Sequence, residues 1–413
     1  MSELSYLEKL LDGVEVEWLP LAKVCRLING RAYKQEELLS KGKYPVLRVG
    51  NFFTNQNWYY SDLELDQDKY CDNGDLLYAW SASFGPRIWH GGKSIYHYHI
   101  WKVVPDSNLI CKQFLYYLLQ WDTKALKDAH STGSTMMHIS KTTIEKRLVP
   151  IPCPDNPEKS LAIQSEIVRI LDKFTALTAE LTAELNMRKK QYNYYRDQLL
   201  SFDDEQEKPI YLEKLLDGVE VEWLPLGEVS ALRRGRVMSK GYLTDNFGPY
   251  PVYSSQTANN GKIGSINTFD FDGEYISWTT DGANAGTVFY RTGKFSITNV
   301  CGLITLKSKY PLIYKFLFYW LTIEAKKHVY SGMGNPKLMS HQVENISVPI
   351  LCPDNPEKSL AIQSEIVRIL DKFDTLTNSI TEGLPREIEL RQKQYEYYRD
   401  LLFSFPKPET VSN

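Results

Sequence analysis

Two long stretches of the chain place apolar or aromatic residues at steps of three and four, the spacing of one helix face. Each stretch follows the four residues Asp-Asn-Pro-Glu, at 155–158 and 354–357, a pattern typical of a helix start. A helix of roughly 45 residues would be about 68 Å long at 1.5 Å per residue. The apolar stripe includes Ile167, Leu171, Phe174, Tyr192 and Tyr195 in the first stretch, and Ile366, Leu370, Phe373, Tyr395 and Tyr398 in the second.

A single apolar stripe of this length needs a partner. The economical partner is the other stretch, paired antiparallel as a coiled coil with pseudo-two-fold symmetry. The alternative is that each helix lies on its own neighbouring domain. The second stretch is longer: 21 residues separate Phe373 from Tyr395, against 17 between Phe174 and Tyr192. Gly383 and Pro385 fall in this insert, so we expect a kink or a short break there.

The chain is an internal duplication. Tyr6–Leu21 recurs without change as Tyr211–Leu226, Cys153–Phe174 recurs as Cys352–Phe373, and Gln191–Phe202 is nearly identical to Gln394–Phe405. The segments between these repeats, residues 22–152 (the first head) and 227–351 (the second head), differ almost everywhere. They keep short matches, such as Gly30-Arg31 with Gly235-Arg236 and Gly92-Lys93 with Gly293-Lys294. We therefore expect two domains of one fold with different surfaces.

Each head is predicted to be mixed α/β with many short strands between glycine- and asparagine-bearing turns. The expected strands are 44–50, 75–80, 86–90 and 95–104 in the first head, and 250–253, 274–278, 286–290 and 300–306 in the second. Each head is expected to end in an amphipathic helix, 112–129 or 314–330, followed by a polar loop. The whole chain is thus α+β, divided into 1–21, 22–152, 153–203, 204–226, 227–351, 352–405 and 406–413.

Charge distinguishes the heads from the rest of the chain. The whole sequence carries a net charge of −3. The first head has 17 basic and 12 acidic residues and the second has 13 and 8, so each carries +5 and the remainder −13. Two basic domains in an acidic frame indicate contact with a polyanion at two places.

Reading of DNA bases requires Arg, Lys, Asn, Gln, Ser or Thr on loops that reach a groove. The alternative is that such residues belong to ordinary polar surface loops without a role in recognition. The candidates in the first head are Arg31, Lys34, Arg48, Asn51, Arg87, Ser134, His138 and Lys141. Those in the second are Arg233, Arg234, Arg236, Lys240, Asn260, Lys262, Asn284, Asn335 and Lys337.

Motifs for catalysis are missing. No Pro-Pro dipeptide exists, which excludes the Asn/Asp-Pro-Pro-Tyr/Phe loop of an adenine methyltransferase, and there is no phosphate-binding glycine loop. The alternating acids 62–68 fit an exposed strand or turn better than a nuclease site. His97 and His99 would share one strand face, and with His90 could bind a metal, but no further ligand is evident. We predict no catalytic and no metal site; the alternative is a fused methyltransferase or nuclease.

Six cysteines occur without a CxxC pair, and the N-terminus has no apolar signal region. Free, buried thiols and a cytoplasmic location are expected, and no stretch is long and apolar enough to span a membrane.

The arrangement resembles the specificity (S) subunit of type I restriction–modification enzymes. Two variable domains are each followed by Pro-x-x-Pro-Glu-Lys-x-x-x-Ile-Gln-x-x-Ile-Val-x-x-Leu-Asp-x-Phe, as in 353–373, and by Gln-Tyr-x-Tyr-Tyr-Arg-Asp, at 191–197 and 394–400. The resemblance covers essentially the whole chain. It departs from symmetry at the insert of 383–385.

The resemblance implies that the heads are target recognition domains, each of which reads one half of a bipartite site on double-stranded DNA. It implies that the repeated helices hold two methyltransferase (M) subunits and that restriction (R) subunits join for cleavage. S-adenosylmethionine, ATP and Mg²⁺ would bind to those partners and no cofactor to this chain. Individual base-reading residues do not carry over from the family.

Overall fold

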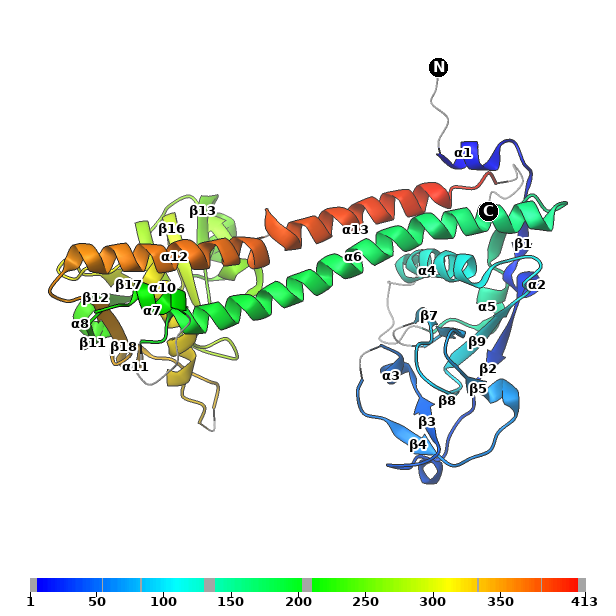
Figure 1. Ribbon diagram of the computed structural model, residues 1–413, viewed down its shortest axis with the longest axis horizontal. Helices are drawn as coiled ribbons and strands as arrows, with labels where there is room; N and C mark the ends of the chain where they lie inside the picture. Colours follow the sequence, from blue (N-terminus) through cyan, green and yellow to red (C-terminus); the bar gives the residue numbers. More distant parts are fainter. Residues whose placement is uncertain are drawn as a thin grey trace, which may run out of the picture. The chain divides into compact units, whose positions relative to one another are not determined.

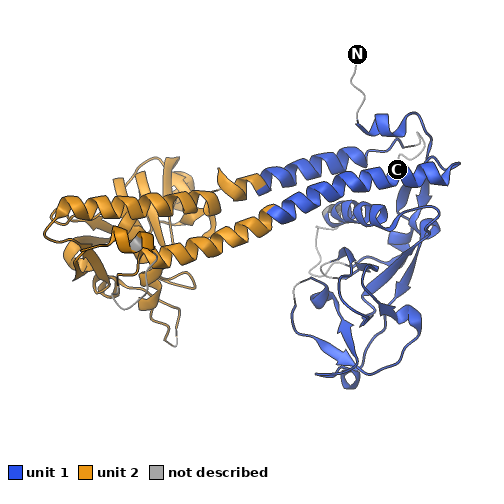
Figure 2. Ribbon diagram, in the orientation of Figure 1, with its two compact units in different colours: residues 1–180, 388–413 blue, residues 181–387 orange. Residues whose placement is uncertain are grey.

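A computed structural model describes residues 6–53, 55–81, 84–129, 138–202, 210–332, 334–379 and 381–407 of the chain. The residues form two compact units (Figures 1 and 2). Unit 1 comprises residues 1–180 and 388–413, and unit 2 comprises 181–387. Each unit therefore contains one head, the beginning of one repeated helical stretch and the end of the other.

A two-stranded ribbon of repeated sequence closes the base of each head. In unit 1, β1 (Val16–Pro20) pairs antiparallel with β10 (Leu148–Pro152), with Trp18 opposite Pro150. In unit 2, β11 (Val221–Pro225) pairs with β18 (Ser347–Leu351), with Trp223 opposite Pro349. The registers are equivalent because β1 and β11 are identical in sequence and β10 and β18 share Val-Pro-Ile, so both heads begin and end on equivalent ribbons.

The second head is built on one six-stranded sheet, with β13 parallel to β16 and the other neighbours antiparallel. Its order is β12 (Ser230–Arg234), β17 (Cys301–Leu306), β15 (Phe271–Thr279), β16 (Val288–Ile297), β13 (Phe247–Tyr253) and β14 (Lys262–Ile266). Its core contains Trp278 and Phe316, which are fully buried.

The first head divides the same strand order between two four-stranded sheets. One is β2 (Cys25–Asn29), β9 (Ile100–Pro105), β6 (Leu76–Ala79) and β7 (Gly85–Ile88); the other is β4 (Tyr59–Ser61), β3 (Tyr44–Leu47), β8 (Ser94–Tyr96) and β5 (Tyr70–Cys71). The turn residues 72–75, with Gly74 at φ 85°, separate β5 from β6, and residues 89–93 separate β7 from β8. The pairs β5–β6 and β7–β8 thus correspond to the uninterrupted β15 and β16, which supports one ancestral fold.

The structure corrects two strand predictions in the first head. The expected strand 95–104 is interrupted, because residues 97–99 form a turn between β8 and β9, and His97 and His99 therefore do not lie on a strand face. The expected strand 44–50 ends at Leu47, where a short helix soon follows. The remaining short helices are α1 (Tyr6–Leu11), α2 (Leu21–Val24), α3 (Val49–Phe53), α5 (Lys141–Glu145), α7 (Ile210–Leu215), α8 (Leu226–Val229), α9 (Lys240–Asp245) and α11 (Ser340–Glu344).

The repeated stretches are helical, as predicted, and the break in the second is confirmed. The first copy is one helix, α6 (Pro157–Leu199), whereas the second consists of α12 (Pro356–Asn378) and α13 (Gly383–Leu402). Gly383 has φ 78°, and a Cβ there would lie 2.4 Å from the Thr375 carbonyl oxygen. Only glycine fits this close approach of the backbone.

Each helical copy packs on its own head, and within each unit it also contacts the other copy: Phe174 stacks on Tyr398 in unit 1, and Tyr195 stacks on Phe373 in unit 2. α4 (Lys112–Ala129) supports the start of α6, and α10 (Tyr314–Glu324) supports α12. Buried Gln164 accepts from the Cys111 N–H and donates to the Leu109 carbonyl (both 2.9 Å). Gln363 makes the equivalent pair with Ile313 (2.9 Å) and Pro311 (2.6 Å).

The end of the chain completes unit 1. Phe403 and Phe405 are buried against Phe114 of α4, with ring centroids 5.8 and 6.3 Å away. In unit 2, Phe202 lies at the repeated position of Phe405 and packs against Phe316 at 6.1 Å. The C-terminal segment therefore occupies in one unit the place that an internal segment occupies in the other.

All six cysteines are free; Cys111 and Cys153 are only half-buried, so the expectation of burial holds for four of them. No helix in the described ranges is long and apolar enough to cross a membrane.

Candidate nucleic-acid interface

A close crossing of backbones defines one place in both heads. A Cβ on Gly30 would lie 2.3 Å from the Tyr96 carbonyl oxygen, and one on Gly235 would lie 2.2 Å from that of Ile297. The arginine that follows each glycine accepts a hydrogen bond from the turn that precedes β9 or β17. Tyr98 N–H donates to the Arg31 carbonyl (3.0 Å), and Asn299 N–H donates to the Arg236 carbonyl (3.1 Å). We call residues 97–99 and 298–300 the first and second crossing turns.

Aromatic and histidine rings surround the first crossing turn. Trp80 donates from its indole to the Tyr98 carbonyl at 2.8 Å. The rings of Tyr98 and His99 are 3.9 Å apart, those of Trp80 and His99 4.8 Å, and those of Trp80 and His138 5.9 Å. Flat rings of this kind offer stacking and apolar contact to bases.

His97 is half-buried at this turn. Burial, with smaller contributions from His99 and Arg48, lowers the pKa of His97 to about 4. Burial also lowers the pKa of His99. His97 is consequently neutral near pH 7 and can accept or donate a hydrogen bond through its ring nitrogens.

Polar side chains replace these rings at the second crossing turn. Thr298 stands at the position of His97, Asn299 at that of Tyr98 and Thr280 at that of Trp80. Thr298 Oγ1 lies 2.8 Å from Ser254 Oγ, and the guanidinium of Arg234 donates to the Asn299 carbonyl at 2.8 Å. The second head thus presents hydrogen-bonding groups where the first presents rings.

Three candidates of the first head adjoin its crossing turn. Arg31 bridges to His97 but is held by Glu37 through two bonds of 2.7 and 2.9 Å. His138 pairs with Ser81, beside Trp80, and Arg48 follows Leu47, whose carbonyl accepts from the His97 N–H at 2.9 Å. The sequence singled out Arg31, Arg48 and His138, but it did not identify Trp80 or Tyr98.

Other candidates of the first head lie elsewhere. Asn51 donates to the backbone carbonyls of Asn55 and Asn57, and Arg87 lies over the Phe53 ring at 4.9 Å. Lys34 faces Glu36 at 3.8 Å and Lys141 faces Glu145 at 3.7 Å, without a bond to the crossing turn among the described residues. Ser134 lies outside the described residues.

The second head brings several candidates together. Arg236 pairs with Asp270 at 3.0 Å and bridges to Thr298, and Lys337 bridges to Asp281. Asn260 and Lys262 are exposed near Ser254. Asn284 is half-buried and its carbonyl accepts from Thr279, whereas Arg233, Lys240 and Asn335 are exposed and bond to neither crossing turn among the described residues.

An apolar groove of about 480 Å³ lies on the repeated helices of unit 1. Phe174 stacks on Tyr398 with ring centroids 5.3 Å apart. Tyr6 donates to Glu166 at 2.9 Å, and Arg169 holds the same carboxylate, which lowers the pKa of Glu166 to about 2. The groove is lined by Tyr6, Arg169, Ile170, Lys173, Phe174, Leu177, Tyr398, Leu401 and Leu402.

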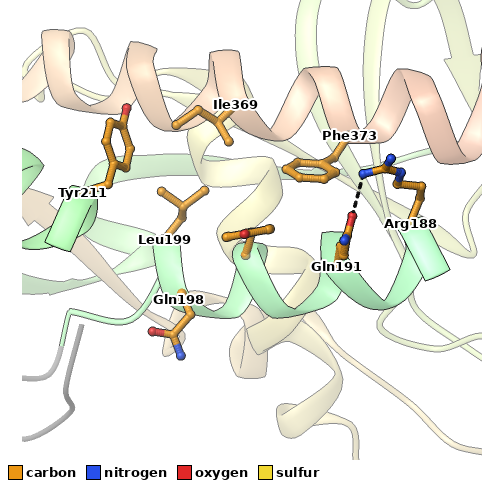
Figure 3. Close-up of a pocket in the computed structure, with 8 residues that line it drawn as sticks. Arg188, Gln191, Gln198, Leu199, Tyr211, Ile369 and Phe373 are labelled. Atoms are coloured by element: carbon orange, nitrogen blue, oxygen red, sulfur yellow. Dashed lines mark hydrogen bonds between the residues drawn. The ribbon is translucent and has the colours of Figure 1, made fainter. Parts of the chain in front are cut away.

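Unit 2 has the corresponding groove, of about 430 Å³ (Figure 3). Ile369 and Phe373 point from α12 towards Leu199 of α6, and Tyr195 stacks on Phe373 at 5.5 Å. Tyr211 donates to Glu365 at 2.5 Å, as Tyr6 does to Glu166. The lining residues are Arg188, Gln191, Tyr195, Gln198, Leu199, Tyr211, Ile369 and Phe373.

The other stripe residues lie below these grooves. Ile167, Leu171, Ile366 and Leu370 are fully buried, and Tyr192 and Tyr395 are half-buried against the cores. Six repeated positions line both grooves, and five of them hold the same residue; at the sixth, Leu401 in unit 1 corresponds to Gln198 in unit 2. The chain therefore carries two similar, largely apolar grooves, one in each unit.

The acidic residues weighed for nuclease chemistry do not form a cluster. Glu64 is bound to Lys43 and to the Tyr44 hydroxyl, and Asp62 accepts from the backbone of Lys43. Across the described part of the chain, no group of three His, Cys, Asp or Glu residues is arranged to hold a metal ion.

Two basic heads with divergent crossing turns, set on duplicated helices, define a two-headed recognition protein, and known proteins identify its family. The family described as Type I restriction modification DNA specificity domain matches residues 14–188 and 218–390. The chain is 39% identical over its full length to the full-length Escherichia coli type I restriction enzyme EcoR124I/EcoR124II specificity subunit. It is 36% identical to the EcoprrI specificity subunit of the same species, with 92% of this chain and 93% of the relative covered. The chain belongs to the type I restriction–modification specificity subunits.

A solved structure shares this fold. The S subunit of the type I restriction–modification system from M. genitalium has a TM-score of 0.56 at 16% identity, and the match covers 96% of this chain and 98% of that one. A fold match at this identity agrees with two duplicated α+β units.

Proposed function

We propose that each head reads one half of a bipartite DNA site and that the chain has no catalytic activity of its own. The observation that carries this proposal is the pair of crossing turns, where the same backbone bonds hold rings in one head and polar groups in the other. Different side chains on one scaffold are what two different half-sites require. Chemistry, with S-adenosylmethionine, ATP and Mg²⁺, would reside on partner subunits, in the cytoplasm.

The two grooves are the proposed docking sites for two methyltransferase subunits. Their equivalent residues, Phe174 with Tyr398 and Phe373 with Tyr195, offer the same apolar surface twice, which fits two copies of one partner. Restriction subunits would join the assembled complex.

The test is to map N6-methyladenine in DNA that is exposed to the chain together with its methyltransferase subunit. We expect methylation at one bipartite sequence, and binding that weakens strongly between 50 and 200 mM salt because phosphate contacts release counterions. Turnover by the purified chain alone, given DNA, methyl donor and Mg²⁺, would contradict the non-catalytic role.

Partner docking is tested with Phe174→Ala and Phe373→Ala. Each variant is expected to bind one methyltransferase subunit instead of two, as measured by light scattering. Tyr98→Asn, in a head, is the control and should keep two. A variant that still binds two partners with unchanged affinity would place the docking surface elsewhere.

A further inference from the structure

Arg291 of β16 is a buried cation in the second head without an acidic partner. Arg291 is only 3% exposed. Among the described residues, no carboxylate lies within ion-pairing distance of its guanidinium. Its guanidinium lies over the Tyr253 ring at 3.6 Å and the Phe289 ring at 4.4 Å. Burial lowers the pKa of Arg291 to about 10, so it stays charged near neutral pH. A buried charge of this kind is costly and calls for a purpose other than packing.

The polar bonds of Arg291 hold a turn. Nε donates to Ser277 Oγ at 3.0 Å, and Nη1 donates to the Asn260 carbonyl at 2.8 Å. Asn260 belongs to a turn in which three successive residues have positive φ: 49° at Asn259, 55° at Asn260 and 80° at Gly261. Asparagine tolerates this left-handed region better than other residues with a Cβ, but a run of three persists only where the surroundings enforce it.

The turn exposes its side chains to solvent. Asn259, Asn260 and Lys262 are exposed, and neither asparagine side chain has a hydrogen bond within the described ranges of the chain. Gly261 is buried, and a Cβ there would lie 3.0 Å from Arg291 Nη2. The backbone is therefore fixed from inside while two amides and one ammonium face outward.

The same turn is tied to the second crossing turn. Ser254 Oγ contacts Thr298 Oγ1 at 2.8 Å, and Ser255 Oγ donates to the Asp281 carbonyl at 2.6 Å. The Ser254 N–H donates to the Gly261 carbonyl at 2.9 Å, which closes the loop. Exposed amides on a fixed backbone beside the second crossing turn are suited to a base edge, because an asparagine amide pairs with adenine N6 and N7 in the major groove.

We propose that residues 259–262 form a base-reading turn of the second head, with Asn259 and Asn260 contacting bases and Arg291 as the positioning residue that holds their backbone. This inference rests on the proposed DNA-reading function of the head. Lys262 would contact a phosphate.

The experiment selects bound duplexes from a randomised pool with the full chain assembled with its methyltransferase subunits. The double variant Asn259→Gly with Asn260→Gly keeps the left-handed backbone and removes both amides. It is expected to lose about tenfold in preference for the favoured base at one or two positions of one half-site. The other half-site is the internal control and keeps its preference.

Arg291→Met and Arg291→Lys separate positioning from packing. Methionine fills the apolar niche without holding the Asn260 carbonyl, so it should reproduce the loss at the same positions while the melting temperature stays within a few degrees. Lysine keeps a donor and should restore part of the preference, which a packing role alone would not produce.

The outcomes are distinguishable. If the unaltered assembly selects no motif, the proposed function fails and this inference with it. If it selects a motif that the double glycine variant keeps within twofold, the base-reading turn is wrong and the proposed function stands. If the glycine variant loses preference but a folded Arg291→Met does not, the positioning role is wrong; should Arg291→Met unfold, the glycine variant still decides on the turn.

Discussion

The two crossing turns share their backbone bonds and almost none of their side chains. In both, a glycine-arginine pair passes against the turn with no room for a Cβ, and the strand that follows pairs with the first strand of the head. The first turn carries His97, Tyr98 and His99 among aromatic rings, whereas the second carries Thr298 and Asn299 among hydroxyl and amide groups. The scaffold is thus the same in both heads, and the side chains vary at the turns that we propose contact DNA.

The sheets around the turns also combine a shared topology with local differences. In the second head β15 and β16 run without a break, and in the first head each is interrupted, at residues 72–75 and 89–93. The breaks leave the strand order and the base ribbon unchanged. Each head keeps an equivalent base ribbon and supporting helix, and the repeated helices keep the hydrogen bonds of Gln164 and Gln363, so a head can change above a conserved frame.

The largest expected effect concerns the frame. Phe405→Ala removes a ring that is 4% exposed, and Phe202→Ala removes its counterpart, which is 8% exposed. Each is expected to lower the free energy of unfolding of its own unit by about 3–5 kcal/mol, because a buried ring leaves a cavity. Urea unfolding followed by hydrogen exchange would assign the loss to unit 1 or unit 2. If Phe405→Ala left the free energy of unfolding of unit 1 unchanged, Phe405 and Phe202 would not have equivalent roles in the two units.

The next effect concerns the crossing. Gly30→Ala and Gly235→Ala each place a Cβ within 2.4 Å of a carbonyl oxygen, so the backbone must shift. We expect a loss of about 1–3 kcal/mol in each case and weaker DNA binding through that head alone. Gly92→Ala, where a Cβ meets nothing within 4 Å, is the control. Base preference at each half-site, measured on a randomised duplex pool, should change on one side only; a change on both sides would mean that the heads are coupled.

Much of the frame could be predicted from the sequence because its signals are local or repeated. The bounds of α4, Lys112–Ala129, follow from its apolar periodicity, and the break before Gly383 follows from a residue that tolerates positive φ. The prediction of one continuous strand over 95–104 was wrong, because hydrophobic periodicity does not reveal a tight turn inside an apolar run. No helix-start or turn residue marks His97 to His99.

The rest of the site depends on contacts between distant residues. Trp80 joins the first crossing turn through Tyr98, and Arg291 reaches Asn260 across 31 positions of sequence. A buried arginine looks like any surface arginine in a sequence, and nothing local shows that Phe405 packs on Phe114. The Gly30-Arg31 and Gly235-Arg236 matches were the one local signal of the crossing, since glycine is required there in both heads.

Exchange of Tyr98 and Asn299, the middle residues of the two crossing turns, tests whether these turns determine base preference. Tyr98 is 39% exposed and Asn299 stands at its equivalent position. Tyr98→Asn should reduce the preference for the favoured base at one position of the first half-site by about five- to tenfold, and Asn299→Tyr should do so in the second half-site. The measurement is methylation of duplexes with single base changes. An equal loss at every base would indicate phosphate contact instead of base reading.

The smallest expected effect is a difference in pH response between the heads. His97 has a pKa of about 4 in the folded protein, below its ordinary value near 6.5. The unfolded chain therefore binds more protons between these values, and the stability that His97 contributes above pH 6.5 is lost as the pH falls towards 4. Thr298, at the same position of the second head, does not titrate. The protection of β8 and β9 against hydrogen exchange, relative to the intrinsic rate at each pH, should fall on acidification from pH 7 to 5 more than that of β16 and β17, and His97→Thr should abolish the part of the difference that this position causes. If the variant kept the full difference, the burial of His97 would not be its source, and the contrast between ring-bearing and polar turns would concern recognition alone.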